Sequence, residues 1–491
     1  MNNIFAAGGW FLWGLFVTGY IYQRIFSGKK VRKRWGRDGE TLTADLIRRH
    51  FRRDEFDDLT ISERLFPFRV RADLQRAIDE IFNDSSKVSH FCGIKKEYSH
   101  DGITLSACMV GSDHYAATAV PPQYEEVDVG EESPIRCLKT GLWFLETNDQ
   151  RYVVLLSSAE RFGRVTGVQF QIATENCPAG TQIAQQFFRH LEEFVSTAGC
   201  YRGKVLSLEQ TDHSYSGESS GISVHKLRTV SREQVVLPSH TLDLLDRNVI
   251  QFSQRRSQLS KFQQSTKKGI LFYGPPGTGK THTIHYLADA LQEHTTLLIT
   301  AEQIGLLSEY MTLARLLQPS IVVIEDADLI ARDREDLNSC EEVILNRLLN
   351  EMDGLKEDID VLFILTTNRP EKLEQALASR PGRIDQAIEF PYPDEVGRAK
   401  LVQLYAAAIQ LDDELINLVV KRTEGVSAAF IKELMRRALQ FQLERPDAEC
   451  LTSSDVEAAL DEMLFIGGKL NQKLLGGDAV TDRAVGFRSD P

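Results

Sequence analysis

The stretch that decides the fold of this chain runs Ile270-Leu-Phe-Tyr-Gly-Pro-Pro-Gly-Thr-Gly-Lys-Thr281. Its first four residues form a short apolar run typical of a strand, and a helical pattern follows over residues 282–292. The loop between them consists of Gly274, Pro275, Pro276, Gly277, Thr278, Gly279, Lys280 and Thr281. A strand, a glycine-rich loop and a helix in this order predict a phosphate-binding loop, because glycines let backbone N–H groups approach phosphate oxygens.

Two later apolar runs end in side chains suited to phosphate chemistry. Residues 321–324 lead into Glu325 and Asp326, and residues 361–365 are followed closely by Asn368. Carboxylates at the end of a strand beside such a loop hold Mg²⁺ and the attacking water, and an amide orients water or a phosphate oxygen. Continuous apolar strands that alternate with helices predict a parallel sheet covered on both faces, and therefore an α/β fold.

The ordered motifs carry a family resemblance. The segments GPPGTGKT, PSIVVIEDADLIA, ILNRLLNEMDGL, TTNRPEKLEQAL and RPGRIDQAIEFPYPD span residues 270–394. They resemble the ATPase domain of the AAA family, within the AAA+ superfamily. The resemblance implies a three-layer P-loop domain in which residues 274–281 bind ATP as the Walker A loop, Glu325 and Asp326 form Walker B, and Asn368 is sensor 1. Thr281 and Glu325 are then the expected contacts of Mg²⁺.

The same resemblance implies an oligomer. Arg380 and Arg383 flank a Pro-Gly turn and match the family's arginine fingers, which reach the ATP of the next subunit. We therefore expect a homo-oligomeric ring, usually of six subunits in this family. Helical patterns over residues 395–410, 412–423, 427–444 and 454–466 resemble the family's helical lid, and Ser454 with Glu457 predicts a capping box for the last one.

Three departures from the family pattern bear on mechanism. The Walker B acids stand in the order Glu-Asp. This order resembles that of the membrane-anchored mitochondrial AAA chaperones that assemble a respiratory complex. Those chaperones also carry one transmembrane helix and a middle domain before the ATPase. In the sensor 2 region Ala428 and Phe430 replace Gly and Asp. No aromatic pore loop is recognisable over residues 300–319, and Tyr310 is assigned to a helix, which disfavours threading of an unfolded chain.

The N-terminus predicts a membrane anchor. Residues 4–22 are uncharged and rich in Ile, Phe, Leu, Val and Trp, close to the length of about 20 that crosses a bilayer. Seven Lys and Arg residues follow before Asp38, which places the ATPase on the cytoplasmic or matrix-like side. A cleaved signal peptide would carry its charges before the apolar run.

The rest of the chain divides by pattern. We expect an anchor with its basic flank over 1–37, an α+β domain without a recognisable chemical motif over 38–232, a large ATPase subdomain over 233–394, a helical lid over 395–467 and a flexible tail over 468–491.

Composition limits the classes of function. The 491 residues carry 57 Lys and Arg against 70 Asp and Glu, a net charge of −13, so nucleic acid is an unlikely partner and a DNA motor is disfavoured. The 7 cysteines show no metal-ligand spacing, which argues against a zinc site or a disulfide framework and favours a reducing compartment. A membrane protease would need His-Glu-x-x-His, which is absent.

These patterns predict a membrane-anchored AAA ATPase that couples ATP hydrolysis in a ring to remodelling or translocation of a protein client, whose identity the sequence does not give. The alternative is an ATP-binding regulatory or scaffold protein with little turnover, which the Glu-Asp order and the altered sensor 2 keep open.

Overall fold

The computed structural model describes residues 41–83, 87–96, 102–111, 116–147, 149–161, 164–197, 199–209, 221–328, 359–371, 383–406, 411–445 and 450–466. The predicted membrane segment, Arg380 and the predicted tail lie outside these ranges. Within them we find no helix with the length and apolarity that crossing a bilayer requires.

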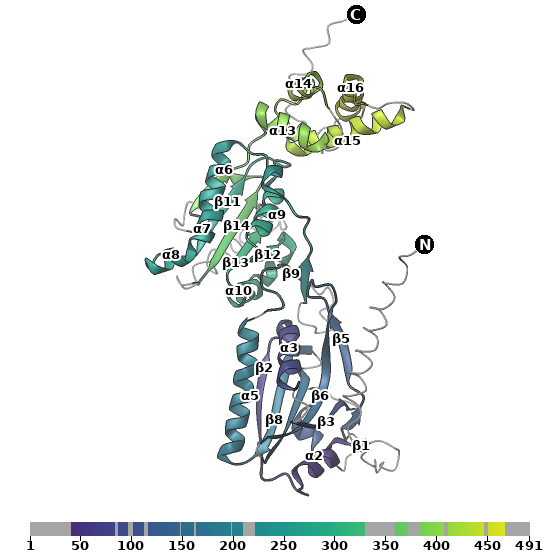
Figure 1. Ribbon diagram of the computed structural model, residues 1–491, viewed down its shortest axis with the longest axis vertical. Helices are drawn as coiled ribbons and strands as arrows, with labels where there is room; N and C mark the ends of the chain where they lie inside the picture. Colours follow the sequence, from purple (N-terminus) through teal and green to yellow (C-terminus); the bar gives the residue numbers. More distant parts are fainter. Residues whose placement is uncertain are drawn as a thin grey trace, which may run out of the picture.

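The N-terminal part is an antiparallel sheet of eight strands, drawn in the lower half of Figure 1. The strands run in the order β1-β4-β3-β6-β7-β8-β2, and β5 pairs with β6. Their bounds are β1 (Thr41–Leu42), β2 (Leu59–Phe66), β3 (Val88–Lys95), β4 (Thr118–Val120), β5 (Gln123–Val127), β6 (Ile135–Thr147), β7 (Gln150–Arg161) and β8 (Arg164–Glu175). In this region, predicted to be α+β, the long strands β6, β7 and β8 form a meander in which each pairs with the next.

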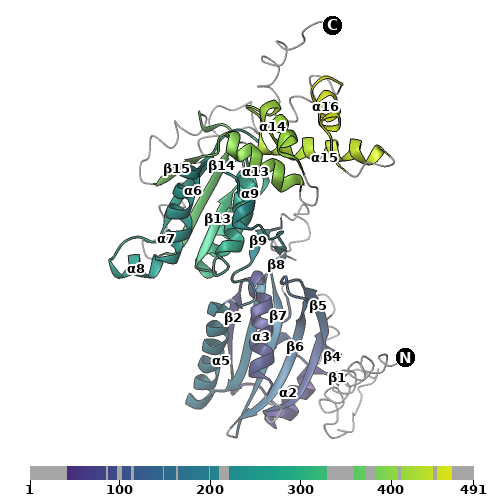
Figure 2. The same ribbon diagram turned by 45° about the horizontal axis from the view of Figure 1, so that its top comes forward.

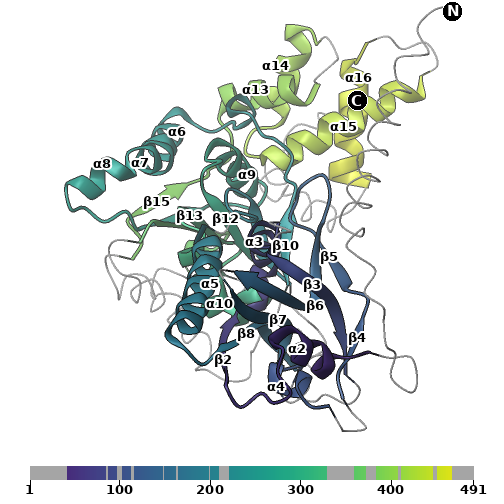
Figure 3. The same ribbon diagram turned by 60° about the horizontal axis from the view of Figure 1, so that its bottom comes forward.

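Helices cover both faces of this sheet. The elements are α2 (Thr43–Phe51), α3 (Arg71–Ile81), α4 (Leu105–Cys108) and α5 (Pro178–Thr197). Leu74 and Phe187 bring α3 and α5 into one apolar cluster with Leu145 of β6. Ile47 and Leu105 bring α2 and α4 into a second cluster, on the face that comes forward in Figure 3. Alternate strand residues thus enter two cores, as the two-residue period of a strand requires.

The ATPase part is built on a seven-stranded sheet in the order β10-β9-β12-β13-β14-β11-β15. Its strands are β9 (Val205–Leu208), β10 (Ile222–His225), β11 (Lys268–Tyr273), β12 (Thr295–Ile299), β13 (Ser320–Ile324), β14 (Val361–Thr367) and β15 (Gln386–Glu389). Its helices are α6 (Ser239–Leu245), α7 (Gln251–Gln254), α8 (Arg256–Lys261), α9 (Lys280–Ala290) and α10 (Leu307–Leu316). In the order in which they lie, β9, β12, β13, β14, β11 and β15 pair in parallel, whereas β10 pairs antiparallel with β9. The sheet is therefore mixed.

The central strands of this sheet are buried on both faces. In β11, Ile270 and Phe272 enter one apolar cluster while Leu271 enters another. All seven residues of β14 are buried. This is the parallel, doubly covered sheet that the continuous apolar runs predict. Strands β9 and β10 precede the boundary predicted at residue 232 and yet lie in the ATPase sheet.

The lid is a helical layer at the C-terminal end of the described chain (Figure 2). It contains α13 (Glu395–Ala406), α14 (Asp413–Arg422), α15 (Ala428–Glu444) and α16 (Ser453–Asp461), which bury one shared core. The predicted capping box at Ser454 and Glu457 is wrong by two residues. Thr452 and Asp455 form it instead, because α16 begins at Ser453.

A polar junction joins the N-terminal part to the ATPase sheet. The Arg202 guanidinium donates hydrogen bonds to carbonyls at the ends of α5 and α10, namely those of Ser196 and Leu316 at 3.2 Å each. Tyr310 of α10 is fully buried, and its hydroxyl accepts a hydrogen bond from the Leu208 N–H at 2.7 Å. The prediction that Tyr310 belongs to a helix is confirmed, and its ring lies in the core of the domain.

Candidate nucleotide-binding site

The glycine loop leaves β11 through backbone conformations that favour glycine. Gly274, Gly277 and Gly279 have φ values of 145°, 76° and 101°. A Cβ on Gly274 would lie 2.3 Å from the Phe390 carbonyl oxygen, and one on Gly277 would lie 2.9 Å from the Ser427 Oγ. The first two glycines are therefore required by close contacts as well as by their backbone angles.

Lys280 opens α9 and turns its side chain back over the loop. Its Nζ donates hydrogen bonds to the carbonyl oxygens of Gly274 at 2.7 Å and Pro275 at 2.9 Å, and the side chain is buried. The Thr278 hydroxyl donates to the Pro275 carbonyl at 2.8 Å. An ammonium group is thus fixed at the start of a helix, where the backbone N–H groups also favour an anion.

Thr281 and Glu325 meet across the end of the sheet. The Thr281 hydroxyl donates a hydrogen bond to Glu325 Oε1 at 2.8 Å. The end of β13 is fixed as well, because the Glu325 N–H donates to the Ile299 carbonyl at 3.0 Å. A hydroxyl and a carboxylate are the hard oxygen donors that Mg²⁺ prefers, so this pair fits the metal that the sequence implies. Among the described residues there is no cluster of His, Cys, Asp and Glu suited to any other metal.

Asp326 and Asn368 form a second pair beside the first. The Asn368 Nδ2 donates a hydrogen bond to Asp326 Oδ1 at 3.1 Å, and the Asp326 N–H donates to the Thr366 Oγ1 at 3.0 Å. Asp326 has a φ of 48°, in the left-handed region, which Asp and Asn tolerate better than other residues with a side chain. The carboxylate is therefore aimed by its own backbone and by the end of β14.

Asp328 positions the end of β14, a role that the sequence analysis did not assign. Its buried carboxylate accepts hydrogen bonds from the Thr367 hydroxyl at 2.9 Å and from the Asn368 N–H at 3.1 Å. The amide of Asn368 is thereby held toward Asp326. A carboxylate two residues after the Walker B pair was the available signal, but nothing in the sequence says that it faces the next strand.

The lid touches the glycine loop directly. The Ala429 N–H, in the first turn of α15, donates a hydrogen bond to the Gly277 carbonyl at 3.1 Å. Ser427 caps this helix by accepting from the Phe430 N–H at 3.2 Å. The sequence departures at Ala428 and Phe430 therefore lie at the helix end that faces the loop, and Phe430 itself is buried in the lid core.

The segment before α6 also lines this junction, although no sequence motif indicates a role for it. The Gln234 carbonyl lies 3.2 Å from Nε2 of His282 in the first turn of α9. Val236 packs against the lid core, whereas Leu237 packs against the core of the large subdomain. Three short stretches, from this segment, α9 and α15, therefore surround one end of the loop.

Arg383 lies just before the N-terminal end of β15, whereas the glycine loop follows the C-terminal end of the neighbouring strand β11. Arg383 precedes Asp385, whose N–H and carboxylate pair with the backbone of Gly269 at 2.8 Å each. The loop begins beyond Tyr273, which is level with Glu389 on β15. The four strand steps between these levels span about 13 Å. Arg383 and the loop of its own chain are therefore separated by the length of β15, and Arg380 is not among the described residues.

The protonation of Lys280 predicts how ATP binding depends on pH. Burial lowers the pKa of its ammonium group to about 8, although the charges of Asp326 and Asp328 oppose the shift. Phosphate oxygens favour the charged ammonium, so ATP binding takes up a proton above that pH. We expect a constant ATP affinity below about pH 8 and a decrease of up to about tenfold per pH unit above it, measured by nucleotide titration.

Two features check this pH prediction. Lys280→Arg is expected to give weaker binding without the decrease, because a guanidinium stays charged throughout the range. For the protein alone, the folded state releases this proton near pH 8 whereas the unfolded chain holds it up to 10.5, so the lysine's contribution to the free energy of unfolding rises with pH between these values. Equal pH profiles for the two proteins would contradict the prediction.

The comparisons with known proteins agree with this geometry. Residues 270–392 match the model of the ATPase family associated with various cellular activities, AAA. Residues 270–392 are an AAA ATPase domain. The chain is also 33% identical over 208 residues to a proteasome-activating nucleotidase of Methanosphaerula palustris, which covers 40% of this chain and 50% of the relative.

Two further proteasome-activating nucleotidases show the same extent of similarity. That of Pyrococcus furiosus is 32% identical over 225 residues, or 43% of this chain and 56% of the relative. That of Methanopyrus kandleri is 36% identical over 214 residues, or 40% and 48%. The chain thus spans about half the length of the curated relatives it matches. The AAA domain is of the kind that binds and hydrolyses ATP, which confirms the predicted class of enzyme.

Proposed function

We propose that this chain is a membrane-anchored ATPase that works as a homo-oligomeric ring and uses ATP hydrolysis to remodel or move a protein client. The proposal depends on the AAA domain for its chemistry, on Arg383 for the ring and on the apolar N-terminal stretch for the anchor. The three parts are independent, because each can fail without the others.

The triphosphate is placed by the loop and by Lys280. Backbone N–H groups of residues 274–281 and the start of α9 face the phosphates, and the Lys280 ammonium, which lies against the Gly274 and Pro275 carbonyls, extends to the β and γ phosphate oxygens. Thr281 and Glu325, already joined at 2.8 Å, are the residues that would hold Mg²⁺. When bound, Mg²⁺ neutralises charge on the phosphates.

Asp326 and Asn368, the second pair, are the residues that would activate the attacking water. Asp326 provides the carboxylate that accepts a proton from the attacking water, and Asn368 orients it through the 3.1 Å hydrogen bond to that carboxylate. The reversed acid order is then consistent with function: the longer Glu325 side chain reaches Thr281, whereas the shorter Asp326 side chain stands beside Asn368. The two carboxylates therefore have separate tasks, one at the metal and one at the water.

The single observation that carries the ring is the position of Arg383. It lies at the start of the parallel strands, whereas the glycine loop lies at their C-terminal ends, so it does not reach the phosphates bound by its own chain. An arginine that stabilises the charge of the transition state must then act on the ATP of a neighbouring copy. A ring closes this head-to-tail contact, and six subunits are expected from the family resemblance.

Localisation and client complete the proposal. The uncharged stretch 4–22 with its basic flank supports a single transmembrane helix, with the ATPase on the cytoplasmic or matrix-like side. This layout and the Glu-Asp order support a role like that of the membrane-anchored chaperones that assemble a mitochondrial respiratory complex. The buried Tyr310 offers no pore aromatic, so we favour movement of a folded or membrane-linked client over threading.

Mixing two inactive variants tests the ring. Arg383→Ala retains a complete loop, and Lys280→Ala retains the arginine, so each is expected to hydrolyse ATP at least about 1,000-fold more slowly. A mixture of the two is expected to regain turnover, because mixed rings contain complete sites. Arg189→Ala, which changes an exposed arginine on α5, is the control and should keep normal turnover.

Three results would count against the proposal. Full turnover by Arg383→Ala would exclude the arginine finger. Mixed rings, demonstrated by their size, that recover no turnover would exclude action between subunits. Negligible turnover by the unmutated full chain in assembled rings would favour the alternative, an ATP-binding scaffold.

A further inference from the structure

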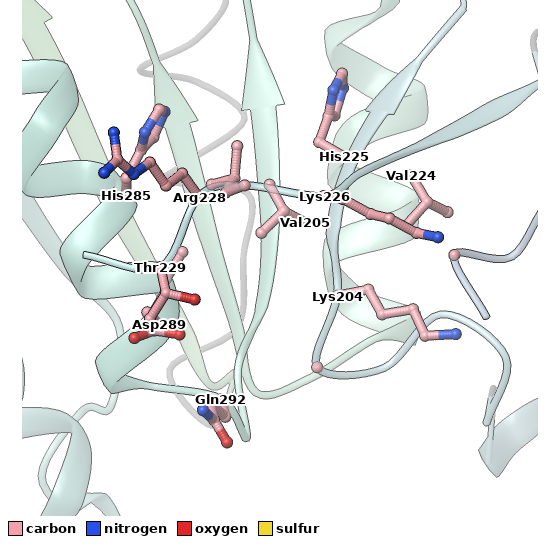
Figure 4. Close-up of a pocket in the computed structure, with 14 residues that line it drawn as sticks. Lys204, Val205, Val224, His225, Lys226, Arg228, Thr229, His285, Asp289 and Gln292 are labelled. Carbon is pink, nitrogen blue, oxygen red and sulfur yellow. The ribbon is translucent and has the colours of Figure 1, made fainter. Parts of the chain in front are cut away.

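A cavity of about 220 Å³ lies beside the second half of α9, away from the glycine loop (Figure 4). One wall is the stretch 224–229, which begins with the last two residues of β10, and the opposite wall carries His285 and Asp289 of α9 and Gln292 just after this helix. Gly130 of the N-terminal part and Lys204 complete it. The cavity therefore lies where the N-terminal part, the strands β9 and β10, and the helix of the nucleotide site meet.

The walls of this cavity are rich in positive charge. Its titratable side chains are Lys204, His225, Lys226, Arg228, His285 and Asp289. Three are permanent cations and one is an acid, although the chain as a whole has a net charge of −13. Such a local reversal of sign is the electrostatic signature of an anion site.

Two of the cations have no protein partner in the part of the chain that the structure describes. Lys204 donates to the Val129 carbonyl at 2.6 Å and pairs with the Glu131 carboxylate at 3.4 Å, but neither Lys226 nor Arg228 makes a hydrogen bond or ion pair in the described residues. Figure 4 shows Arg228 beside His285 at one end of the cavity, and Lys226 extending toward the other end with Lys204. Cationic groups thus stand at both ends of one partly open pocket.

The charge continues toward the lid. Burial lowers the pKa of His282, and the charges of His285, Lys432 and Arg228 lower it further. Arg228 of the wall segment and Lys432 of α15 therefore direct positive charge toward this part of α9. A bound anion would be attracted by both cations.

We propose that this cavity binds a small phosphate-class anion, held by Arg228 and His285 with Lys226 at the far end. The cavity of about 220 Å³ is partly open to solvent and has room for a phosphate group. Arg and Lys donate several charge-assisted hydrogen bonds to phosphate oxygens. Free phosphate and the phosphate of a small ester share this chemistry.

The site bears on ATP hydrolysis through α9. The helix is 11 residues long, or about 16 Å, with Lys280 and Thr281 at its first turn and Asp289 near its last. An anion that ties Arg228 to His285 fixes this helix to the segment that leaves β10 of the same sheet. The effect on turnover rests on the proposed function, whereas binding of the anion does not.

The test is phosphate binding by the full chain saturated with Mg·ADP, which fills the glycine loop. Inorganic phosphate is titrated in a calorimeter, and glycerophosphate is titrated separately. Arg228→Gln and His285→Asn are each expected to weaken phosphate binding at least about tenfold. Arg247→Gln changes an exposed arginine on the large subdomain by the same charge, and it should bind like the unmutated protein.

The outcomes separate cleanly. Binding of both anions assigns the site to a phosphate group on any small carrier, and binding of inorganic phosphate alone assigns it to the free ion. Equal affinity in Arg228→Gln and Arg247→Gln, or phosphate binding that vanishes once ADP is bound, would overturn the site. If the protein binds phosphate but hydrolyses no ATP, the proposed function fails and the anion site stands.

Discussion

Lys280→Ala in the full chain is expected to bind ATP at least about 100-fold more weakly than the unmutated protein. The ammonium group lies over the loop, 2.7 Å from the Gly274 carbonyl and 2.9 Å from that of Pro275. Two charge-assisted hydrogen bonds to phosphate, worth about 1.5 kcal/mol each, account for a loss of this size. Titration with a fluorescent ATP analogue, followed by competition with ATP, measures it.

The control for this variant is Lys261→Ala, which removes an exposed lysine at the end of α8 and should bind ATP normally. The thermal unfolding of Lys280→Ala should remain close to that of the unmutated protein. The buried ammonium has a lowered pKa, so removing it also removes a group whose charge the fold disfavours. Unchanged ATP affinity in a folded Lys280→Ala protein would contradict the assignment of the loop.

Sequence patterns predicted the ATPase sheet because its strands are apolar without interruption. Residues 321–324 and 361–365 are buried on both faces, and such runs have few structural alternatives. The glycine loop was predictable for a different local reason, since its glycines adopt backbone angles that other residues avoid. Local physics alone was sufficient at these positions.

Other features depend on contacts between distant segments, and no local pattern encodes them. Strands β9 and β10 enter the ATPase sheet only because Val205 and Leu206 pair with β12. Asp328 acts on Asn368, which lies 40 residues later in the chain. The capping box of α16 lies two residues before the predicted one, because Thr452 and Ser454 are chemically similar caps that a local pattern does not distinguish.

Asp326→Asn is expected to reduce ATP turnover about 100-fold to 10,000-fold while leaving ATP binding intact, because it removes the carboxylate that we propose accepts the proton of the attacking water. The change is nearly isosteric, and asparagine tolerates the φ of 48° that this position adopts. The hydrogen bond from Asn368 can also persist, since the new amide retains one carbonyl oxygen. Turnover and nucleotide affinity, measured on the same preparation of the full chain, separate the chemical step from binding.

The order of the two acids sharpens this experiment. Glu325→Gln alters the group that meets Thr281, so it is expected to weaken the response to Mg²⁺ as well as turnover, whereas Asp326→Asn should leave the Mg²⁺ concentration for half-maximal activity unchanged. Asp243→Asn makes the same chemical change at an exposed position on α6 and should have no effect on either quantity. If the first two variants proved indistinguishable in both quantities, Glu325 and Asp326 would share one task. The second position of the pair needs a positive φ, and a left-handed backbone position tolerates aspartate better than glutamate. This gives a physical reason for the Glu-Asp order.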